Sequence, residues 1–316
     1  MDYNKSKYTV FPDNYSLDRR MANGESLEEI FDGIDYLSKC HTEDEQRPIT
    51  VRIGRKYNYV AKNYLLFDNW FVLADDFQEY DRYSYAYRRN DAYGIREGGV
   101  LIRRDGSYVT REEFVDIKFG NNIGHGSYAI VKQYNGLLNV IEVATGNKLD
   151  QIGLKADCIA ANENNYDFGI FIVAKGDIKS LHDLDWLVNF KGEEIAMSKR
   201  LKMNFCSFKN GLLSPDLWFD YVEPFQIEPI GDSYSFAKFT VVRLNNKYNY
   251  ISTDGKLLSD IWFDVASVYG YGRFGIAGIL RNSSYSQLPD YDDEFEYNPA
   301  KYVLYHIDRY GRIKKK

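Results

Sequence analysis

The chain has 316 residues, of which 44% are hydrophobic and 27% charged, and this composition predicts a folded protein rather than a disordered one. Its net charge of −6 argues against a general attraction to nucleic acid or to an anionic membrane. The three cysteines, Cys40, Cys158 and Cys206, form no CxxC pair, and no apolar run is long enough to span a bilayer. We therefore expect a soluble protein of the cytoplasm, or of a virion or other particle assembled there, with no membrane partner.

Residues 1–50 differ from the rest of the chain and predict one amphipathic helix. Ser26 and Glu29 have the spacing of a capping box, which marks a helix start. Apolar residues then follow at helical intervals up to a predicted end near Cys40, and they are Leu27, Ile30, Phe31, Ile34 and Leu37. We expect this helix to cover the open face of the first repeat, and the alternative is a helix that docks on a partner.

Residues 51–316 predict a domain of repeated short β-strands. Each unit has a bulky residue followed by Asn or Gly, at Tyr57-Asn58, Tyr93-Gly94, Leu138-Asn139, Met203-Asn204 and Tyr248-Asn249. Because Asn and Gly tolerate positive φ best, we expect a bulge or tight bend at these positions. A turn glycine follows, at Gly106, Gly146, Gly192, Gly211, Gly255 and Gly311. A β-branched residue four positions earlier, at Ile102, Val188, Ile251 and Ile307, predicts a hairpin of fixed register.

An aromatic residue followed by a small one recurs at intervals of 43, 40, 68 and 38 residues, in Tyr85-Ala86, Tyr128-Ala129, Phe168-Gly169, Phe236-Ala237 and Phe274-Gly275. A period near 40 residues is typical of repeat architectures, and we expect each pair to lie in the closing strand of a unit. The 68-residue interval predicts a degenerate unit around residues 186–195. A partial unit at 304–313 would end the array, after a long acidic insertion at 282–300.

These units resemble WG repeats, the bacterial repeats in which Trp-Gly opens a hairpin and a Gly-Leu-Ala-like strand closes the unit. The resemblance covers about residues 51–313, although Tyr-Asn, Tyr-Gly, Leu-Asn or Met-Asn replaces Trp-Gly. It implies a diverged member of a family of β-rich interaction modules found in bacteria and their phages, with no shared catalytic residues. The predicted fold is mainly β: a tandem array of about six short β-meanders, propeller-like or solenoid, with an N-terminal helical cap.

Candidate chemistry is sparse in this sequence. Residues 270–275 spell GxGxxG, but the run lies in a repeat strand and no helix pattern follows, as dinucleotide binding would require. The four histidines share no metal-ligand spacing, and the acidic insertion lacks the glycine of a calcium loop. No motif of nucleophilic or zinc catalysis is present. We therefore predict a protein that is not an enzyme, with no catalytic, cofactor-binding or metal-binding residues.

The predicted function is binding of a protein partner along the repeat surface, in a phage or bacterial accessory or structural protein. The candidate surface residues recur at equivalent repeat positions, and they are Trp70, Trp218, Trp262, Asp220 and Asp264. The alternative is a protein that binds or cleaves carbohydrate, because exposed indole rings beside carboxylates suit sugars. Packing inside each repeat is the competing explanation for the tryptophans.

Overall fold

The computed structural model of the chain describes residues 13–34, 48–61, 66–75, 83–90, 96–118, 127–160, 169–176, 201–225, 227–230, 233–267, 274–281, 301–308 and 310–316. The chain divides into two compact units, Met1–Lys155 and Ala156–Lys316. Within the described residues the fold is mainly β, with two helices and six antiparallel sheets of three or four strands. The predicted fold class is confirmed.

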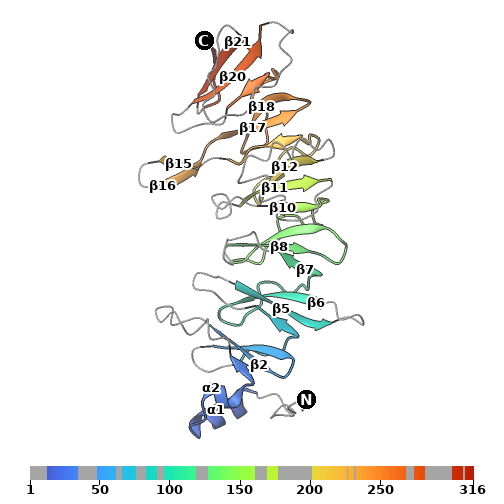
Figure 1. The fold of residues 1–316 in the computed structure, drawn as a ribbon, viewed down its shortest axis with the longest axis vertical. Helices are drawn as coiled ribbons and strands as arrows, with labels where there is room; N and C mark the ends of the chain where they lie inside the picture. Colours follow the sequence, from blue (N-terminus) through green and yellow to red (C-terminus); the bar gives the residue numbers. More distant parts are fainter. Residues whose placement is uncertain are drawn as a thin grey trace. The chain divides into compact units, whose positions relative to one another are not determined.

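In the first unit two helices precede three sheets, which follow one another in chain order (Figure 1). The helices are α1 (Asn14–Ala22) and α2 (Leu27–Ile30). The strands are β1 (Gly33–Ile34), β2 (Ile49–Ile53) and β3 (Lys56–Val60) in the first sheet, β4 (Leu73–Ala74), β5 (Tyr83–Asn90) and β6 (Arg96–Arg103) in the second, and β7 (Asp116–Lys118), β8 (Tyr128–Lys132) and β9 (Leu138–Glu142) in the third.

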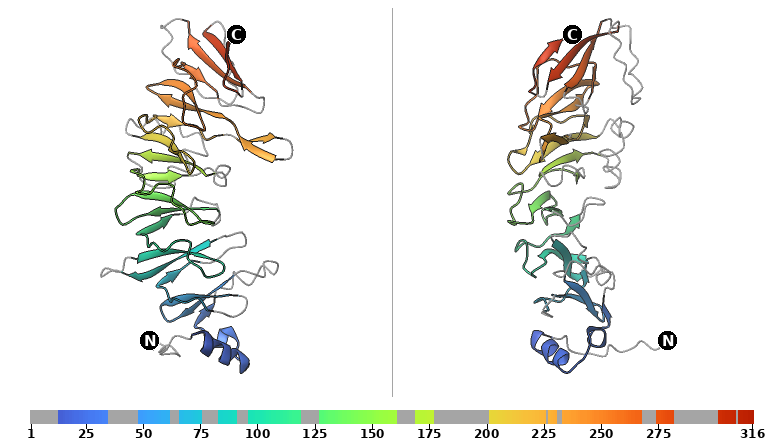
Figure 2. Two further views of the ribbon diagram at one scale, coloured as in Figure 1. Left: turned by 180° about the vertical axis from the view of Figure 1, so that it is seen from behind. Right: turned by 90° about the vertical axis from the view of Figure 1, so that its left-hand side faces the viewer.

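The second unit contains the fourth, fifth and sixth sheets and a two-stranded ribbon, which projects from the side of this unit in Figure 2. The strands are β10 (Cys158–Ala160), β11 (Ile170–Lys175), β12 (Lys202–Ser207) and β13 (Gly211–Leu212) in the fourth sheet, β14 (Tyr221–Val222), β17 (Phe239–Leu244) and β18 (Lys247–Ser252) in the fifth, β19 (Val265–Ala266), β20 (Phe274–Leu280), β21 (Tyr302–Asp308) and β22 (Ile313–Lys315) in the sixth, and β15 (Ile227–Ile230) and β16 (Ser233–Phe236) in the ribbon.

Each sheet is linked to the next by a junction segment, which pairs with the third strand of one sheet and continues into the first strand of the next. Phe71 N–H donates to Tyr57 O at 2.8 Å, and Val72 N–H then donates to Tyr87 O of β5 at 2.8 Å. One buried apolar residue of each junction segment forms the bridge to the preceding third strand, and these residues are Phe71, Phe114, Leu154, Phe219 and Phe263. The junction phenylalanines thus lie where two sheets meet.

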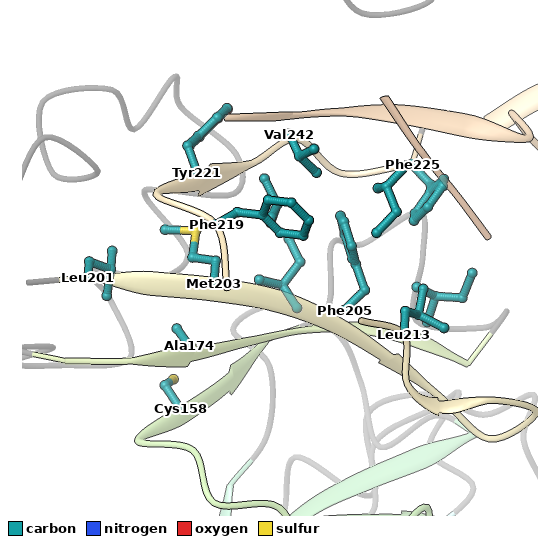
Figure 3. Packing of buried hydrophobic residues seen from close by; sticks show 14 residues of the cluster. Cys158, Ala174, Leu201, Met203, Phe205, Leu213, Phe219, Tyr221, Phe225 and Val242 are labelled. Atoms are coloured by element: carbon teal, nitrogen blue, oxygen red, sulfur yellow. The ribbon is translucent and has the colours of Figure 1, made fainter. Parts of the chain in front are cut away.

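Separate small cores lie between consecutive sheets of a unit rather than in one large interior. Between the fourth and fifth sheets, Phe219 packs between Met203 and Val242 (Figure 3). The rings of Phe205 and Phe225 approach to 4.9 Å between centroids in the same core. Burial of this kind, repeated between neighbours, is the energetic pattern of a repeat protein.

The helical cap of the first sheet is confirmed, but its helix is shorter than predicted. Ser26 N–H donates to Glu29 Oε2 at 2.8 Å at the start of α2, yet the helix ends at Ile30 because Phe31 is extended. Ile34 lies in β1, where it pairs with Val51. Strand pairing therefore overrides the helical periodicity beyond Ile30, and Leu37 and Cys40 lie outside the described residues. The sequence also missed α1, whose Leu17 is fully buried in the same core.

The asparagines of the repeat do not form the predicted bulges. Asn58, Asn139, Asn204 and Asn249 lie within strands and have fully buried side chains, and none of them has a positive φ. Each accepts from the N–H of the following residue and donates from Nδ2 to a carbonyl of its own unit, as in the bond from Asn249 to Ser259 O at 2.8 Å. These positions require a side chain that both donates and accepts, because Asn serves a buried backbone N–H and a partly buried carbonyl at once.

In the second sheet the repeat register differs from the predicted one. Tyr93-Gly94 lies outside the described residues. The positions equivalent to Tyr57-Asn58 are Gly99-Val100, because Gly99 pairs with the junction residue Phe114 as Tyr57 pairs with Phe71. The second sheet therefore lacks the buried asparagine and has the apolar Val100 in its place.

The predicted hairpin register before the turn glycines is confirmed. Ile102, Ile251 and Ile307 pair with Tyr108, Leu257 and Ile313 across their turns. The five turn glycines that are described, Gly106, Gly146, Gly211, Gly255 and Gly311, all have positive φ, whereas Gly192 and Val188 lie outside the described residues. Some of these turns also touch the neighbouring sheet, because a Cβ added to Gly255 would lie 1.9 Å from Leu213 O.

Three of the five aromatic–small pairs, those at Tyr85, Tyr128 and Phe274, lie in middle strands of sheets and not in closing strands, and they differ in register. Phe168 lies outside the described residues. Ala129 of β8 and Gly275 of β20 face equivalent isoleucines of the third strand, Ile141 and Ile307. Ala86 instead lies two positions further along β5, and Phe236 belongs to the ribbon. A small residue is needed where the neighbouring sheet comes close: a Cβ on Gly275 would lie 2.9 Å from the Tyr250 hydroxyl.

Two long connections lie inside sheets and not between repeats. Lys175 of β11 pairs directly with Lys202 of β12, and the predicted degenerate unit at 186–195 comes between these two strands in sequence and lies outside the described residues. The described part of the 68-residue interval includes the ribbon strands β15 and β16. Likewise Leu280 pairs with Tyr302 around residues 282–300, and β21 and β22 complete the sixth sheet instead of forming a partial unit.

Candidate functional site

The predicted surface residues lie on the junction segments. Trp218-Phe219-Asp220 connects the fourth sheet to the fifth, and Trp262-Phe263-Asp264 connects the fifth to the sixth. In both, the phenylalanine is fully buried while the tryptophan and the aspartate are half-buried. The second unit thus brings four of the five predicted residues to the same position of consecutive sheets.

Trp70 belongs to the first unit and is described separately. It occupies the equivalent position before Phe71 and packs against the core formed by the helices and the first sheet. Val72 follows Phe71, so the carboxylate of the other two junctions is missing here. The first unit therefore offers an indole without an adjacent aspartate.

The two aspartates close the hairpin of the sheet that they enter. Asp220 Oδ2 accepts from Asn245 N–H at 2.6 Å, and Asp264 Oδ2 accepts from Leu280 N–H at 2.8 Å. At other sheets Asp32 accepts from Gly54 N–H at 2.6 Å and Asp157 from Gly176 N–H at 2.8 Å. The same bond in four sheets identifies a structural role for this carboxylate.

Each of the two junction aspartates also pairs with a lysine on the preceding sheet. Lys202 Nζ contacts Asp220 Oδ1, and Lys247 Nζ contacts Asp264 Oδ1. The aspartate side chains are 25% and 15% exposed. Their charge is therefore neutralised within the chain, which leaves less of it for a sugar hydroxyl or a basic partner.

A third lysine covers Trp218. Lys175 Nζ lies 3.6 Å from the centroid of the Trp218 ring, in the geometry of a cation–π contact. This ammonium occupies one face of the indole, and a stacked sugar would have to use the other face. Trp262 lies partly against the core between the fourth and fifth sheets. The carbohydrate alternative stays a prediction, with these contacts against it.

Three lysines and one exposed apolar residue at this surface were not predicted from the sequence. Lys202 and Lys247 stand directly before Met203-Asn204 and Tyr248-Asn249, and Lys56 stands before Tyr57-Asn58 in the same way. This recurrence was a signal in the sequence. Ile261, which is 45% exposed beside Trp262, has no such signal, since its exposure depends on the fold. We call Trp218, Ile261 and Trp262 the Trp–Ile row.

The described residues offer little for chemistry. No group of three His, Cys, Asp or Glu side chains among them could hold a metal ion. Cys158 and Cys206 are buried thiols outside any disulfide of the described residues, and burial raises the pKa of Cys206. A thiol in this environment stays protonated and unreactive. What the row presents is apolar and aromatic surface flanked by neutralised charges. No helix in the described parts of the chain has the length and apolar character needed to cross a membrane.

Comparisons with known proteins give no family. The sequence matches no protein-family model and no curated protein. Similar solved structures include a eukaryotic initiation factor, with 10% identity and a TM-score of 0.31 over 92% of this chain and 76% of the other. The C-terminal WD40 domain of Sif2 gives 10% identity and a TM-score of 0.26, over 83% of this chain and 64% of the other. The Neurospora crassa Pan2 WD40 domain gives 10% identity and 0.28, over 73% and 68%. These TM-scores are too low to assign a family, and the sheet topology alone identifies a β-repeat protein.

Proposed function

We propose that this chain is a non-enzymatic repeat protein that binds a protein partner through the Trp–Ile row of its second unit. The observation that carries the proposal is the exposed Ile261 beside the half-exposed Trp262, with Trp218 half-exposed at the equivalent position of the preceding junction. Tryptophan is enriched among residues that dominate binding energy, especially within an apolar centre surrounded by polar groups.

The charges around the row support a protein partner more than a charged ligand. Lys202 and Lys247 are already paired with aspartates, and Lys175 lies on the Trp218 ring. The row therefore combines apolar side chains with two neighbouring lysine–aspartate pairs and one lysine on an indole ring. Such a surface suits a partner with its own apolar contact patch and little net charge.

The repeat pattern supports a narrower identity. The Lys-Tyr-Asn and Trp-Phe-Asp sequences are those of diverged WG-like units, and we propose a bacterial or phage accessory or structural protein on that basis. Such a protein would act in the cytoplasm, or in a virion if it is phage-encoded. The proposal needs no cofactor.

The test is capture of partners from a lysate of the native host with the tagged full chain, followed by mass spectrometry. We expect a partner that the wild type retains and Ile261→Lys loses, because a charge placed in the apolar centre opposes desolvation. Tyr310→Lys is the matched control, since Tyr310 is also exposed, at 57%, and lies at the end of the sixth sheet. This control should retain the partner.

Two outcomes would overturn the proposal. One is a set of captured proteins that is identical for the wild type, Ile261→Lys and Trp218→Ala. The other is saturable binding on a glycan array that Trp218→Ala abolishes while its circular dichroism spectrum remains native. That second result would establish the carbohydrate alternative.

A further inference from the structure

A buried arginine that forms no ion pair with any described residue lies in the fifth sheet. Arg243, in the middle strand β17, is only 4% exposed. Its Nε is buried and makes no hydrogen bond, and no carboxylate among the described residues forms an ion pair with it. A largely buried guanidinium without an ion pair is costly, because it has lost much of its water and no carboxylate replaces it.

Arg243 lies at the end of an otherwise apolar row. Strand alternation places its side chain on the same face as Phe239 and Val241, which belong to the core between the fifth and sixth sheets. It pairs with Tyr221 on one side and Tyr248 on the other. The Tyr221 ring centroid lies 5.7 Å from the guanidinium carbon, and this is the one favourable side-chain contact that the described residues provide.

The charged groups nearest in the fold are engaged elsewhere. Asp220, whose N–H donates to Arg243 O, pairs with Lys202. Glu223 accepts from the Tyr221 hydroxyl. Asp264, which follows the residue bridged to Tyr248, pairs with Lys247. None of these three carboxylates forms an ion pair with Arg243, although Glu223 keeps its negative charge when it accepts from a tyrosine hydroxyl.

We propose that Arg243 is the binding residue of an oxyanion site, in which a carboxylate or phosphate that is not part of the fold pairs with the guanidinium. The planar fork of arginine matches both groups through two parallel hydrogen bonds. With so little of Arg243 exposed, approach is restricted, which favours a small or protruding oxyanion over an extended polyanion. The inference goes beyond the proposed function, because it does not involve the Trp–Ile row.

The experiment follows thermal unfolding of the full chain in rising concentrations of sodium phosphate or sodium acetate, with ionic strength held constant by sodium chloride. We expect the Tm of the wild type to rise and then level off with at least one of the two anions, as saturable binding to the folded state requires. A rise with phosphate alone identifies phosphate chemistry, and a rise with acetate identifies a carboxylate, such as one from a partner protein.

Variants assign the effect to this residue. Arg243→Met should abolish the saturable rise, and without oxyanion its Tm should equal or exceed that of the wild type, because an unpaired buried charge is gone. Arg243→Lys should bind about tenfold more weakly, since it keeps the charge and loses the fork. Arg312→Met is the control, because the Arg312 side chain is 77% exposed and pairs with Asp308.

The proposal is overturned if neither anion gives a saturable rise, or if Arg243→Met shows the same rise as the wild type. The latter would identify a general stabilising effect of the salt. If Arg243→Met does not fold, isothermal titration calorimetry of phosphate and acetate into the wild type decides. An absence of saturable heat there would also overturn the site.

Discussion

The close approach of the Gly255 turn to Leu213 O predicts a large loss of stability when Gly255 is replaced by alanine. Alanine there must adopt the positive φ of 79°, which costs about 1–2 kcal/mol for an L-residue. Its Cβ would also lie 1.9 Å from Leu213 O of the fourth sheet, so one turn must move. Overpacking of this kind costs about 1–3 kcal/mol. The movement also disturbs the 2.9 Å bond from Ser214 Oγ to Gly255 O, worth about 1 kcal/mol. We expect Gly255→Ala to lose about 3–6 kcal/mol of unfolding free energy.

Gly211→Ala is the matched control for this substitution. Gly211 has a similar φ of 63°, but nothing lies within 4 Å of its Cβ position, so only the backbone cost of about 1–2 kcal/mol applies. A difference of about 3 kcal/mol between the two variants corresponds to roughly 6–12 °C in Tm. Thermal unfolding followed by circular dichroism measures it. Equal losses for the two variants would refute the reasoning, because they would show that the turns do not restrain each other.

Three further predictions concern stability. Asn249→Ala leaves two buried backbone groups without partners and should lower the unfolding free energy by about 2–4 kcal/mol in urea denaturation; a change within error would contradict this role. Tyr250→Phe removes the hydroxyl that bonds at 2.8 Å to the next sheet, with an expected loss of about 1–2 kcal/mol by the same measurement. For Asp308, burial acts to raise the pKa, but hydrogen bonds from the backbone and side chain of Arg312 and from Tyr310 N–H give it a net lowering. Its stabilising effect is therefore present above the unfolded pKa near 4 and lost as pH falls through the folded value, so the Tm of Asp308→Asn should fall less on acidification than that of the wild type.

Local turn chemistry explains what the sequence predicted well. The β-branched residue four positions before a turn glycine is determined by hairpin geometry alone, and Ile251 and Ile307 both pair as expected. The start of α2 at Ser26 likewise depends on residues close in sequence. The approximate number of sheets follows from the period of these local signals.

Contacts between distant segments explain what the sequence did not predict. Asn204 was predicted to form a bend because asparagine tolerates positive φ. In the fold its side chain instead donates a hydrogen bond to Ser214 O, ten residues later. The register of the aromatic–small pairs depends on how closely the next sheet approaches, as Tyr250 does at Gly275. Long connections such as 177–200 also change the apparent repeat period in the sequence, because the strands on either side, β11 and β12, pair directly whatever the length of the connection.

The candidate site was predicted in position but not in bonding. The tryptophans and aspartates recur at equivalent places, as the aligned sequence segments indicated. The bond from Asn245 N–H to Asp220 crosses 25 residues of chain and has no sequence signature. The exposure of a side chain could not be predicted from the sequence either, since the exposed Ile261 and the buried Ile251 are the same residue type in neighbouring segments.

The side chains that hold the sheets together bond mainly to the main chain. Junction aspartates accept from backbone N–H groups, and buried asparagines and the Tyr250 hydroxyl donate to backbone carbonyls. Every residue type presents those same backbone groups, except the missing N–H of proline. The partners of these bonds are therefore free to change identity without loss of the bond. In a fold stabilised in this way, few positions need the same residue type in successive repeats. The exposed residues can therefore change to suit a new partner while the fold is retained.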